Sequence, residues 1–301
     1  MSNVRPDLRK VDIHDREFQL LSVNNSIYCV PVDDIEEDRH QLQHDLLYRL
    51  CGDRLFFPNI GIPRKILDCG YGFGDWACAV AEEYEDCEVT GVDIYPFGIE
   101  RPPNLVLFGY DLNDRLDDPQ IFERNAYDLI HSRFVAPGIK IIRWPGYVRD
   151  MRRLLRPNGW LQMVEYYPNI QSSSGRLTTD SALYRWFYQY ALAMGTYVHR
   201  EIRIGQQLTG LMTNAGLRNV GGRIENLPIG GWERDPRKAA IGRESVDMIK
   251  DLLDSFALWP LTERLNWTAA QVEALTHEAK RELEDTTLKL YIPIYFAWGQ
   301  R

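Results

Sequence analysis

A glycine-rich stretch over residues 65–76, K-I-L-D-C-G-Y-G-F-G-D-W, carries the clearest chemical signal in the sequence. It opens with a short apolar run that ends at Asp68, and no helix breaker follows between Trp76 and Tyr84. Its three glycines stand at alternate positions: Gly70, Gly72 and Gly74. A strand, a glycine-rich turn and a helix in this order predict a nucleotide-binding crossover, because glycine lets backbone N–H groups approach a ligand where a Cβ would clash.

The spacing of the glycines indicates which ligand the turn would take. A dinucleotide fingerprint requires glycine at its sixth position, where this chain has Asp75, and a carboxylate there would repel a pyrophosphate. A nucleoside with a cationic tail and no phosphates suits the turn better, and S-adenosylmethionine meets both conditions. We expect Asp68 to help hold the ammonium group of that tail. Taken alone, the motif leaves open a glycine turn without any ligand.

A second acidic residue strengthens the nucleoside interpretation. Asp93 ends a predicted strand over 87–93 and lies 23 positions after Gly70, near the spacing of about 20 expected for an acid that binds a ribose. Its carboxylate can accept hydrogen bonds from both ribose hydroxyls, and Ile94 is expected to contact the same ligand.

A third strand is predicted over 104–110, and Asp111 and Leu112 follow it. A carboxylate beside an apolar residue suits the amino group and the ring face of an adenine. An ordinary polar loop is the alternative interpretation of Asp111.

Alternating short strands and helices predict an α/β fold, a Rossmann-like, doubly wound and mostly parallel sheet of seven strands. We expect the final strand, over 288–298, to run antiparallel beside the sixth, with Pro293 at a bulge or an edge. Ligands of such sheets lie beyond the carboxyl ends of the strands. Five ionisable residues fall at those ends: Asp68, Asp93, Asp111, His131 and Glu165.

Residues 1–52 are predicted to form an N-terminal arm, with a β-like piece over 26–30, and a capping helix over 33–50. Residues 53–301 form the main domain. The polar face of the helix is expected to be solvated, although its short link to the binding strand leaves open that it closes over the cofactor. The side chains concerned are Asp38, Arg39, Gln43 and His44.

Two helical insertions, at about 171–205 and 228–287, are expected to form a lid over the substrate. A helix predicted over 179–194 has aromatic residues on several sides, so either it is buried on two faces or some of its rings line a ligand cavity. The predicted substrate contacts are Tyr166, Tyr184, Phe187, Tyr188 and Trp232.

Composition narrows the class of protein. The net charge of −8 argues against a generic nucleic-acid binder, and the five scattered cysteines are typical of reduced, mostly buried thiols. The first ten residues are polar, and no apolar run approaches the roughly 18 residues needed to span a bilayer. We expect a soluble protein of the cytoplasm, with a nuclear location left open, no membrane association and no metal site. The oligomeric state stays open.

From Asp33 to the C-terminus, an ordered series of motifs resembles the class I S-adenosylmethionine-dependent methyltransferases, specifically their fungal LaeA-like group. The motifs are Asp38-Arg-x-x-Leu-Gln-His44, Leu67-Asp-x-Gly-x-Gly-x-Gly74, Val92-Asp93, His131-x-Arg133, Trp144-Pro145, Leu155-x-Pro-x-Gly-Trp160 with Glu165, Pro228-Ile-Gly-x-Trp232 and Tyr291-x-Pro293. The chain departs from the group's pattern at Asn158, where glycine is usual, at an insertion between Ile139 and Trp144, and at Lys289, where histidine is expected.

The resemblance implies an enzyme that transfers a methyl group from S-adenosylmethionine to a small hydrophobic natural-product intermediate, releasing S-adenosylhomocysteine. A hydroxyl is the expected acceptor, because the chain has no Asn/Asp-Pro-Pro-Tyr motif after its fourth strand. If the acceptor must lose a proton, His131 and Glu165 are the candidate bases, followed by His199 and Tyr166; for His131, cofactor contact or packing is the alternative. Two other functions remain open: a regulator of secondary metabolism that acts through nuclear partners, and a cyclase-like enzyme that keeps the cofactor without methylating.

Overall fold

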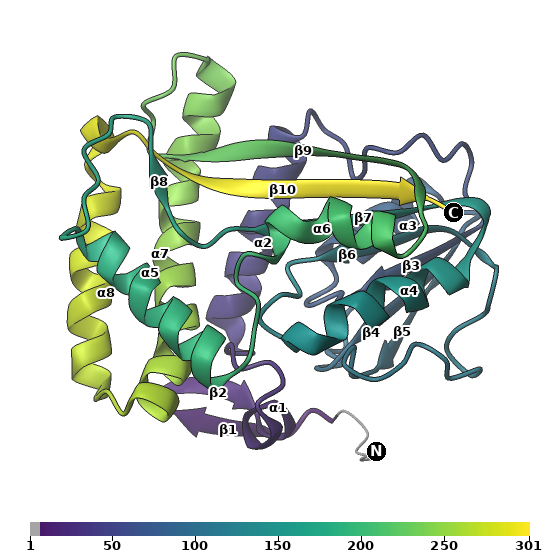
Figure 1. The fold of residues 1–301 in the computed structure, drawn as a ribbon, viewed down its shortest axis with the longest axis horizontal. Helices are drawn as coiled ribbons and strands as arrows, with labels where there is room; N and C mark the ends of the chain where they lie inside the picture. Colours follow the sequence, from purple (N-terminus) through teal and green to yellow (C-terminus); the bar gives the residue numbers. More distant parts are fainter. Residues whose placement is uncertain (1–6) are drawn as a thin grey trace.

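The computed structural model describes residues 7–301 and has a mixed sheet flanked by helices (Figure 1). The strand order is β5-β4-β3-β6-β7-β10, with β9 and the short β8 both paired to β10. The first five strands are parallel, and β10 runs antiparallel to its neighbours β7 and β9. The strands are β3 (Lys65–Cys69), β4 (Glu88–Asp93), β5 (Leu105–Gly109), β6 (Tyr127–Arg133), β7 (Leu155–Tyr166), β8 (Gln171–Ser172), β9 (Arg218–Ile229) and β10 (Leu290–Gln300). The predicted fold class is confirmed, including the antiparallel last strand beside the sixth.

The central strands are apolar on both faces because helices cover both sides of the sheet. Ile66 and Leu129 pack on the face of α3, whereas their successors Leu67 and Ile130 pack on the face of α4 and α6. This alternation follows from the two-residue period of a strand. The helices are α3 (Asp75–Glu83), α4 (Trp144–Leu154) and α6 (Leu208–Asn214), the last preceded by the 3₁₀ turn η3 (Ile204–Gln207).

A second group of helices packs beyond the end of the sheet, on the left in Figure 1. It consists of α2 (Asp34–Leu50), α5 (Ala182–Leu192) with the π-helical turn η2 (Ala193–Tyr197), α7 (Pro236–Leu265) and α8 (Ala269–Leu283). A capping box between Thr268 and Gln271 is present at the start of α8. Asp235 caps the start of helix α7, Pro236 stands in its first turn, and Pro260 is accommodated inside it.

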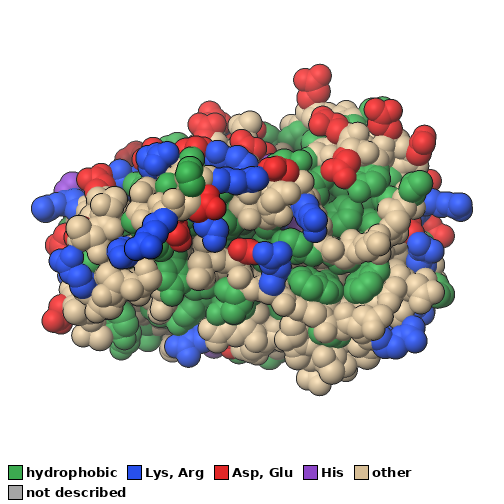
Figure 2. All heavy atoms as spheres, turned by 90° about the horizontal axis from the view of Figure 1, so that it is seen from above, with side chains coloured by type: hydrophobic (Ala, Val, Ile, Leu, Met, Phe, Trp, Pro, Cys, Tyr) green, Lys and Arg blue, Asp and Glu red, His purple; other side chains and the backbone are tan. Residues whose placement is uncertain are grey.

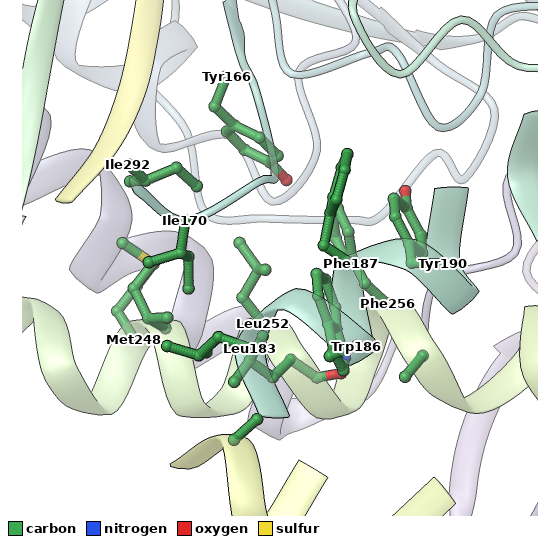
Figure 3. Close-up of a cluster of buried hydrophobic side chains, with 14 of the residues drawn as sticks. Tyr166, Ile170, Leu183, Trp186, Phe187, Tyr190, Met248, Leu252, Phe256 and Ile292 are labelled. Atoms are coloured by element: carbon green, nitrogen blue, oxygen red, sulfur yellow. The ribbon is translucent and has the colours of Figure 1, made fainter. Parts of the chain in front are cut away.

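Aromatic side chains of α5 are divided between the interior and the surface. Trp186, Phe187 and Tyr190 are buried against α7 (Figure 3), and the indole N–H of Trp186 donates to the carbonyl of Leu253 at 3.0 Å. Tyr184 and Tyr188 are 37% and 56% exposed. The helix is therefore buried on one face, which differs from both alternatives drawn from the sequence.

The N-terminal arm differs from the prediction. It forms a hairpin of β1 (Lys10–Ile13) and β2 (Arg16–Gln19), followed by helix α1 (Leu20–Asn25). The segment 26–30, predicted as β-like, pairs with no strand. Its carbonyl groups at Ser26 and Ile27 instead accept hydrogen bonds from the guanidinium of Arg200, at 2.6 and 2.8 Å.

Strands β7 and β10 each contain a proline. The tripeptide Pro157-Asn158-Gly159 is typical of a turn, but it lies inside β7, where the pairing with β6 shifts register. Pro293 pairs in register with Asn226 of β9, without a bulge, and on its other side it lies between the residues that pair with β7 and those that pair with β8. The carbonyl of Pro293 accepts from Tyr167 on the opposite side, and the missing N–H points to that side too, where β7 has already ended.

The boundary between an N-terminal part and the main domain at residues 52 and 53 stays a prediction. Helix α2, from the N-terminal part, packs closely against α7 of the main domain. Acidic and basic side chains are mixed on the face seen from above in Figure 2. Within residues 7–301, no helix has the length and apolar character needed to cross a membrane.

Candidate cofactor and acceptor site

A cleft of about 980 Å³, including its open mouth, lies at the carboxyl ends of β3, β4, β5 and β6. The glycine turn and the loops after β4, β5 and β6 form its floor, and the arm, α2 and Phe256 of α7 cover it. Of the predicted site residues, those that line the cleft are Gly70, Gly72, Asp93, Ile94, Asp111, Leu112 and Tyr166.

The glycine turn adopts backbone angles that side chains disfavour. Gly70, Gly72 and Gly74 have φ of 83°, 59° and 95°, in the left-handed region where glycine has no steric cost. A Cβ on Gly70 would clash with Val135, and one on Gly72 would lie 3.1 Å from Nδ1 of His40. Gly74 is the N-cap of α3 and does not line the cleft.

Asp93 ends β4 and is joined to the glycine turn. Its Oδ2 accepts the N–H of Gly72 and its Oδ1 accepts the N–H of Tyr95, both at 2.9 Å. Burial raises the pKa of Asp93 to about 6, against the opposing effect of these two N–H donors. The carboxylate still has acceptor positions free for a ligand in the cleft.

The loop after β5 forms the next part of the floor. Oδ1 of Asp111 accepts the backbone N–H and the side-chain amide of Asn113, at 2.9 and 2.8 Å. The same amide donates to the carbonyl of Gly138 at 2.9 Å, which joins this loop to the one after β6. Leu112 and Ile94 add apolar surface beside the two carboxylates.

Asp68 and His131 form a buried pair beneath the glycine turn, and neither lines the cleft. Nδ1 of His131 lies 2.9 Å from Oδ1 of Asp68, and the imidazole stacks on Trp76 with 3.7 Å between ring centroids. Burial lowers the pKa of His131 although Asp68 opposes the effect, so we take the imidazole as neutral and donating to Asp68. This placement differs from the expected contacts of Asp68 with the cofactor tail and of His131 with the cofactor or the acceptor.

Glu165 lies under the loop that follows β6. Its Oε1 accepts the N–H groups of Val135 and Ala136, at 2.9 and 3.2 Å, and burial raises the pKa of the carboxyl to about 8. The side chain therefore fixes a loop of the cleft floor and does not itself line the cleft. His199, also considered as a base, is exposed.

Helix α2 contributes polar residues to the cleft, among them Arg39 and Gln43, which were expected to face solvent. Glu36, Arg39, His40 and Gln43 recur at intervals of three and four residues, so they share one face of the helix. Arg39 is ion-paired with Glu36, and the latter also accepts from Ser255 of α7 at 2.7 Å. Arg39, His40 and Gln43 line the cleft, so the alternative that this helix closes over the ligand is the one the structure supports. The three- and four-residue spacing of these four polar side chains is the feature of the sequence that indicates a shared, buried face.

Arg133, the last residue of β6, was not predicted as a site residue although it belongs to the His131-x-Arg133 motif. It lines the cleft next to the glycine turn. Its nearest polar side-chain partner is His44, with 3.5 Å between Arg133 Nη2 and His44 Nδ1.

Four of the five predicted substrate residues lie outside the cleft. Phe187 packs in the interior of the helical group, Tyr184 and Tyr188 are exposed, and the indole of Trp232 donates to the carbonyl of Leu290. Four rings that do line the cleft, on the side of the helical group, come from Tyr28, Phe134, Tyr166 and Phe256. Among the lining residues, residues 171–205 supply none and residues 228–287 supply Phe256.

A small apolar cavity of about 230 Å³ adjoins this aromatic half of the cleft and shares Gln43, Phe134 and Tyr166 with it. The rings of Phe134 and Tyr166 are 4.5 Å apart between centroids. The remaining lining side chains come from α2, β9, α7 and β10: Leu47, Leu227, Met248, Ile249, Leu252, Ile292 and Ile294.

Comparison with known proteins gives the family. A model of the methyltransferase domain matches residues 39–221, more than half of the chain. The chain is 29% identical over 257 residues to the methyltransferase pytC of Aspergillus terreus, covering 85% of this chain and 77% of that one. It is 28% identical to the N-methyltransferase sirN of Leptosphaeria maculans, covering 92% and 95%. It is also 25% identical to the secondary metabolism regulator laeA of Monascus pilosus, covering 88% and 71%.

The matched region begins within α2 and takes in the glycine turn, Asp93 and the whole floor of the cleft. The chain therefore belongs to the methyltransferase-domain family and is a methyltransferase whose cofactor is S-adenosylmethionine.

Proposed function

We propose that this protein methylates a hydroxyl group of a small hydrophobic natural-product intermediate. One observation carries the proposal: a single cleft combines a nucleoside-type floor, built on Gly72 and Asp93, with an aromatic half formed by the rings of Tyr28, Phe134, Tyr166 and Phe256. An acceptor bound among the rings would therefore lie beside the cofactor.

The floor of the cleft fits S-adenosylmethionine. The absence of a side chain on Gly72 leaves space that a Cβ would take from the cleft, and Asp93 keeps acceptor positions for two ribose hydroxyls. Asp111 with Leu112 and Ile94 would hold the adenine. When bound, the cofactor supplies a methyl group on an already activated sulfonium, so the main task of the protein is to align the acceptor.

The aromatic half of the cleft fits a hydrophobic and partly planar acceptor. Tyr166 lies 4.5 Å from Phe134 and 5.9 Å from Phe256 between ring centroids. The hydroxyls of Tyr28 and Tyr166 have no hydrogen-bond partner within residues 7–301, so both are available to orient a polar group of the acceptor. The adjoining apolar cavity would take a short aliphatic substituent.

His131 and Glu165 act as positioning residues in this proposal. His131 orients Asp68 beneath the turn, and Glu165 holds the loop with Val135 and Ala136. Tyr166 is the one predicted proton-transfer candidate that lines the cleft, and burial raises the pKa of its hydroxyl well above the usual value. Its hydroxyl therefore suits hydrogen bonding to the acceptor better than removal of a proton.

The names of the relatives define the alternatives. One relative is named an N-methyltransferase, so nitrogen is the competing acceptor atom. Others are named regulators of secondary metabolism, which makes a regulatory role through protein partners the second candidate function. A cyclase-like role that keeps the cofactor unchanged is the third.

The test is turnover by the isolated protein. Purified protein is incubated with S-adenosylmethionine carrying a deuterated methyl group and with extracts of hydrophobic fungal metabolites, and products are followed by mass spectrometry. We expect a product that has gained the labelled methyl on oxygen, in equal amount to the S-adenosylhomocysteine formed. The Gly72→Val variant serves as the control without cofactor binding. Label on nitrogen would contradict the hydroxyl assignment, and a converted metabolite without label would support the cyclase-like function.

A further inference from the structure

Two charged side chains of the cleft have no charged partner. The other charged side chains that line the cleft have partners within the protein. Arg39 forms an ion pair with Glu36. The carboxylates of Asp93 and Asp111 accept hydrogen bonds from nearby N–H groups. Arg133 and Asp75 remain. Within residues 7–301, neither forms an ion pair, and the only side chain within hydrogen-bond reach of either is His44 beside Arg133.

The environment makes both unpaired charges costly. Burial lowers the pKa of Arg133 and raises the pKa of Asp75, so in each case the charged form is disfavoured. The two groups do not form an ion pair, but their charges interact: Asp75 raises the pKa of Arg133, and Arg133 lowers the pKa of Asp75, each against the larger effect of burial. Both side chains are partly buried at the cleft. A partly desolvated charge without a partner costs free energy, so two such charges of opposite sign lining one cleft suggest a ligand that supplies both partners.

The place of the two residues along the sheet edge indicates which part of a ligand they meet. Parallel pairing aligns Cys69 of β3 with Ser132 of β6, so Arg133 lies level with Gly70, the first residue of the glycine turn. Asp75 is the first residue of α3, at the other end of the same turn. Both side chains line the cleft. The turn therefore lies between an arginine and a carboxylate.

The order of the strands orients the whole ligand. Reading along the sheet, β5 is followed by Asp111, β4 ends in Asp93, β3 leads into the glycine turn and β6 ends in Arg133. Neighbouring strands are about 4.8 Å apart, so β5 and β6 are separated by about 14 Å. An extended adenosine with an amino-acid tail spans such a distance, with adenine at β5, ribose at β4 and the tail between β3 and β6.

We propose that Arg133 binds the carboxylate and Asp75 the ammonium group of the amino-acid tail of S-adenosylmethionine. This inference rests on the proposed cofactor site and replaces the assignment of the ammonium to Asp68, whose carboxylate is joined to His131 beneath the turn. An arginine provides several N–H donors to a carboxylate. In the complex, the carboxylate of the tail would neutralise the charge of Arg133, and the ammonium group would neutralise the charge of Asp75. The other basic side chains that line the cleft, His40 and Arg39, both contact Glu36.

Three ligands separate the two roles. S-adenosylhomocysteine has the full tail, decarboxylated S-adenosylmethionine keeps the ammonium group alone, and 5′-methylthioadenosine has neither group. Their dissociation constants are measured by calorimetry for the natural protein, for Arg133→Met and for Asp75→Asn. Arg124→Met is the matched control, because Arg124 is exposed and precedes β6 at the opposite edge of the sheet.

We expect Arg133→Met to weaken S-adenosylhomocysteine binding by about 10- to 100-fold, the scale of a charge-assisted hydrogen bond, and to leave the other two ligands unchanged. Asp75→Asn should weaken both ligands that carry the ammonium group and spare 5′-methylthioadenosine. Without ligand, Arg133→Met should melt no lower than the natural protein, because it removes an unpaired charge.

Two results would overturn the assignment. One is unchanged S-adenosylhomocysteine affinity in both variants, and the other is an equal loss for all three ligands, which would indicate a structural role. Failure of the cofactor site itself is distinguishable, since the natural protein would then bind none of the three ligands.

Discussion

The backbone N–H of Gly72 donates a 2.9 Å hydrogen bond to Oδ2 of Asp93. The middle glycine of the turn and the acid at the end of β4 are therefore parts of one structure. Oδ1 of the same carboxylate accepts from Tyr95, so the side chain is fixed on both oxygens while acceptor positions toward the cleft stay free. This relationship explains why a glycine motif and an acid 23 positions after Gly70 identify one ligand site.

Replacing Asp93 should weaken cofactor binding. In Asp93→Ala, both ribose hydroxyls lose their acceptor and the turn loses its anchor at Gly72. We expect a loss of about 1–3 kcal/mol in binding free energy, the scale for hydrogen bonds to a charged group. Calorimetry with S-adenosylhomocysteine measures it, and Asp86→Ala, at an exposed acid before β4, is the control. An unchanged dissociation constant would refute the ribose assignment.

Cofactor affinity should also depend on pH through Asp93. Burial raises the pKa of this carboxyl to about 6, and hydroxyl donors bind the ionised form, so ligand binding favours loss of the proton. Affinity is therefore expected to fall as the pH drops through about 6 and to level off above it. Titrations over this range measure the effect, and Asp93→Asn should remove the step at about 6. The same step in Asp93→Asn would mean that another group titrates.

Adding a side chain to the turn should exclude the ligand. In Gly72→Val, the new Cβ would lie 3.1 Å from Nδ1 of His40, and the backbone φ of 59° disfavours a β-branched residue. We expect no measurable binding of S-adenosylhomocysteine. Gly98→Val is the matched control, because a Cβ there has nothing within 4 Å. Normal binding by Gly72→Val would remove the turn from the cofactor site.

The buried Glu165 should make stability depend on pH. Burial raises the pKa of its carboxyl from 4.5 to about 8, so the folded protein holds a proton that the unfolded chain has released. The stabilisation is fully present below 4.5 and is lost as the pH rises toward 8. Urea unfolding of Glu165→Gln should show less of this decline than the natural protein, since the amide keeps an acceptor for Val135 and Ala136 and cannot ionise.

A matched control for this effect is Glu282→Gln. Glu282 also accepts two backbone N–H groups, from Ala182 and Leu183, but its side chain is only partly buried. Its variant should keep the pH dependence of the natural protein. If Glu165→Gln keeps it as well, the proton held by Glu165 does not explain the decline.

Local patterns predicted much of the cofactor floor. Gly70, Gly72 and Asp93 line the cleft because a strand end, a glycine turn and the next strand end are close in sequence, and parallel pairing brings their carboxyl ends to one edge. Asp68 was misassigned because the same rule does not say which way a strand-end side chain points. Its carboxylate faces His131 on the neighbouring strand.

The cover of the cleft could not be predicted in the same way. Tyr28 and Arg39 reach the cleft through long-range packing of the arm and α2 on α7, which leaves no local pattern apart from the polar stripe on α2. The aromatic helix α5 was assigned to the substrate for its composition, but Trp186 and Phe187 fill the interior between helices. Aromatic residues are common both in protein cores and in binding sites, so composition alone does not distinguish these two roles, and the tertiary contacts decide between them.

Methyl transfer to a hydrophobic hydroxylated molecule is measured by following the fate of a labelled methyl group. With purified protein, deuterated S-adenosylmethionine and a metabolite extract, we predict S-adenosylhomocysteine and a product labelled on oxygen in equal amounts, both absent with Gly72→Val. The contradicting result has two parts. The natural protein binds S-adenosylhomocysteine and the Gly72→Val variant does not, which shows that the cofactor site works. No small molecule in the metabolite extract nevertheless gains the labelled methyl group.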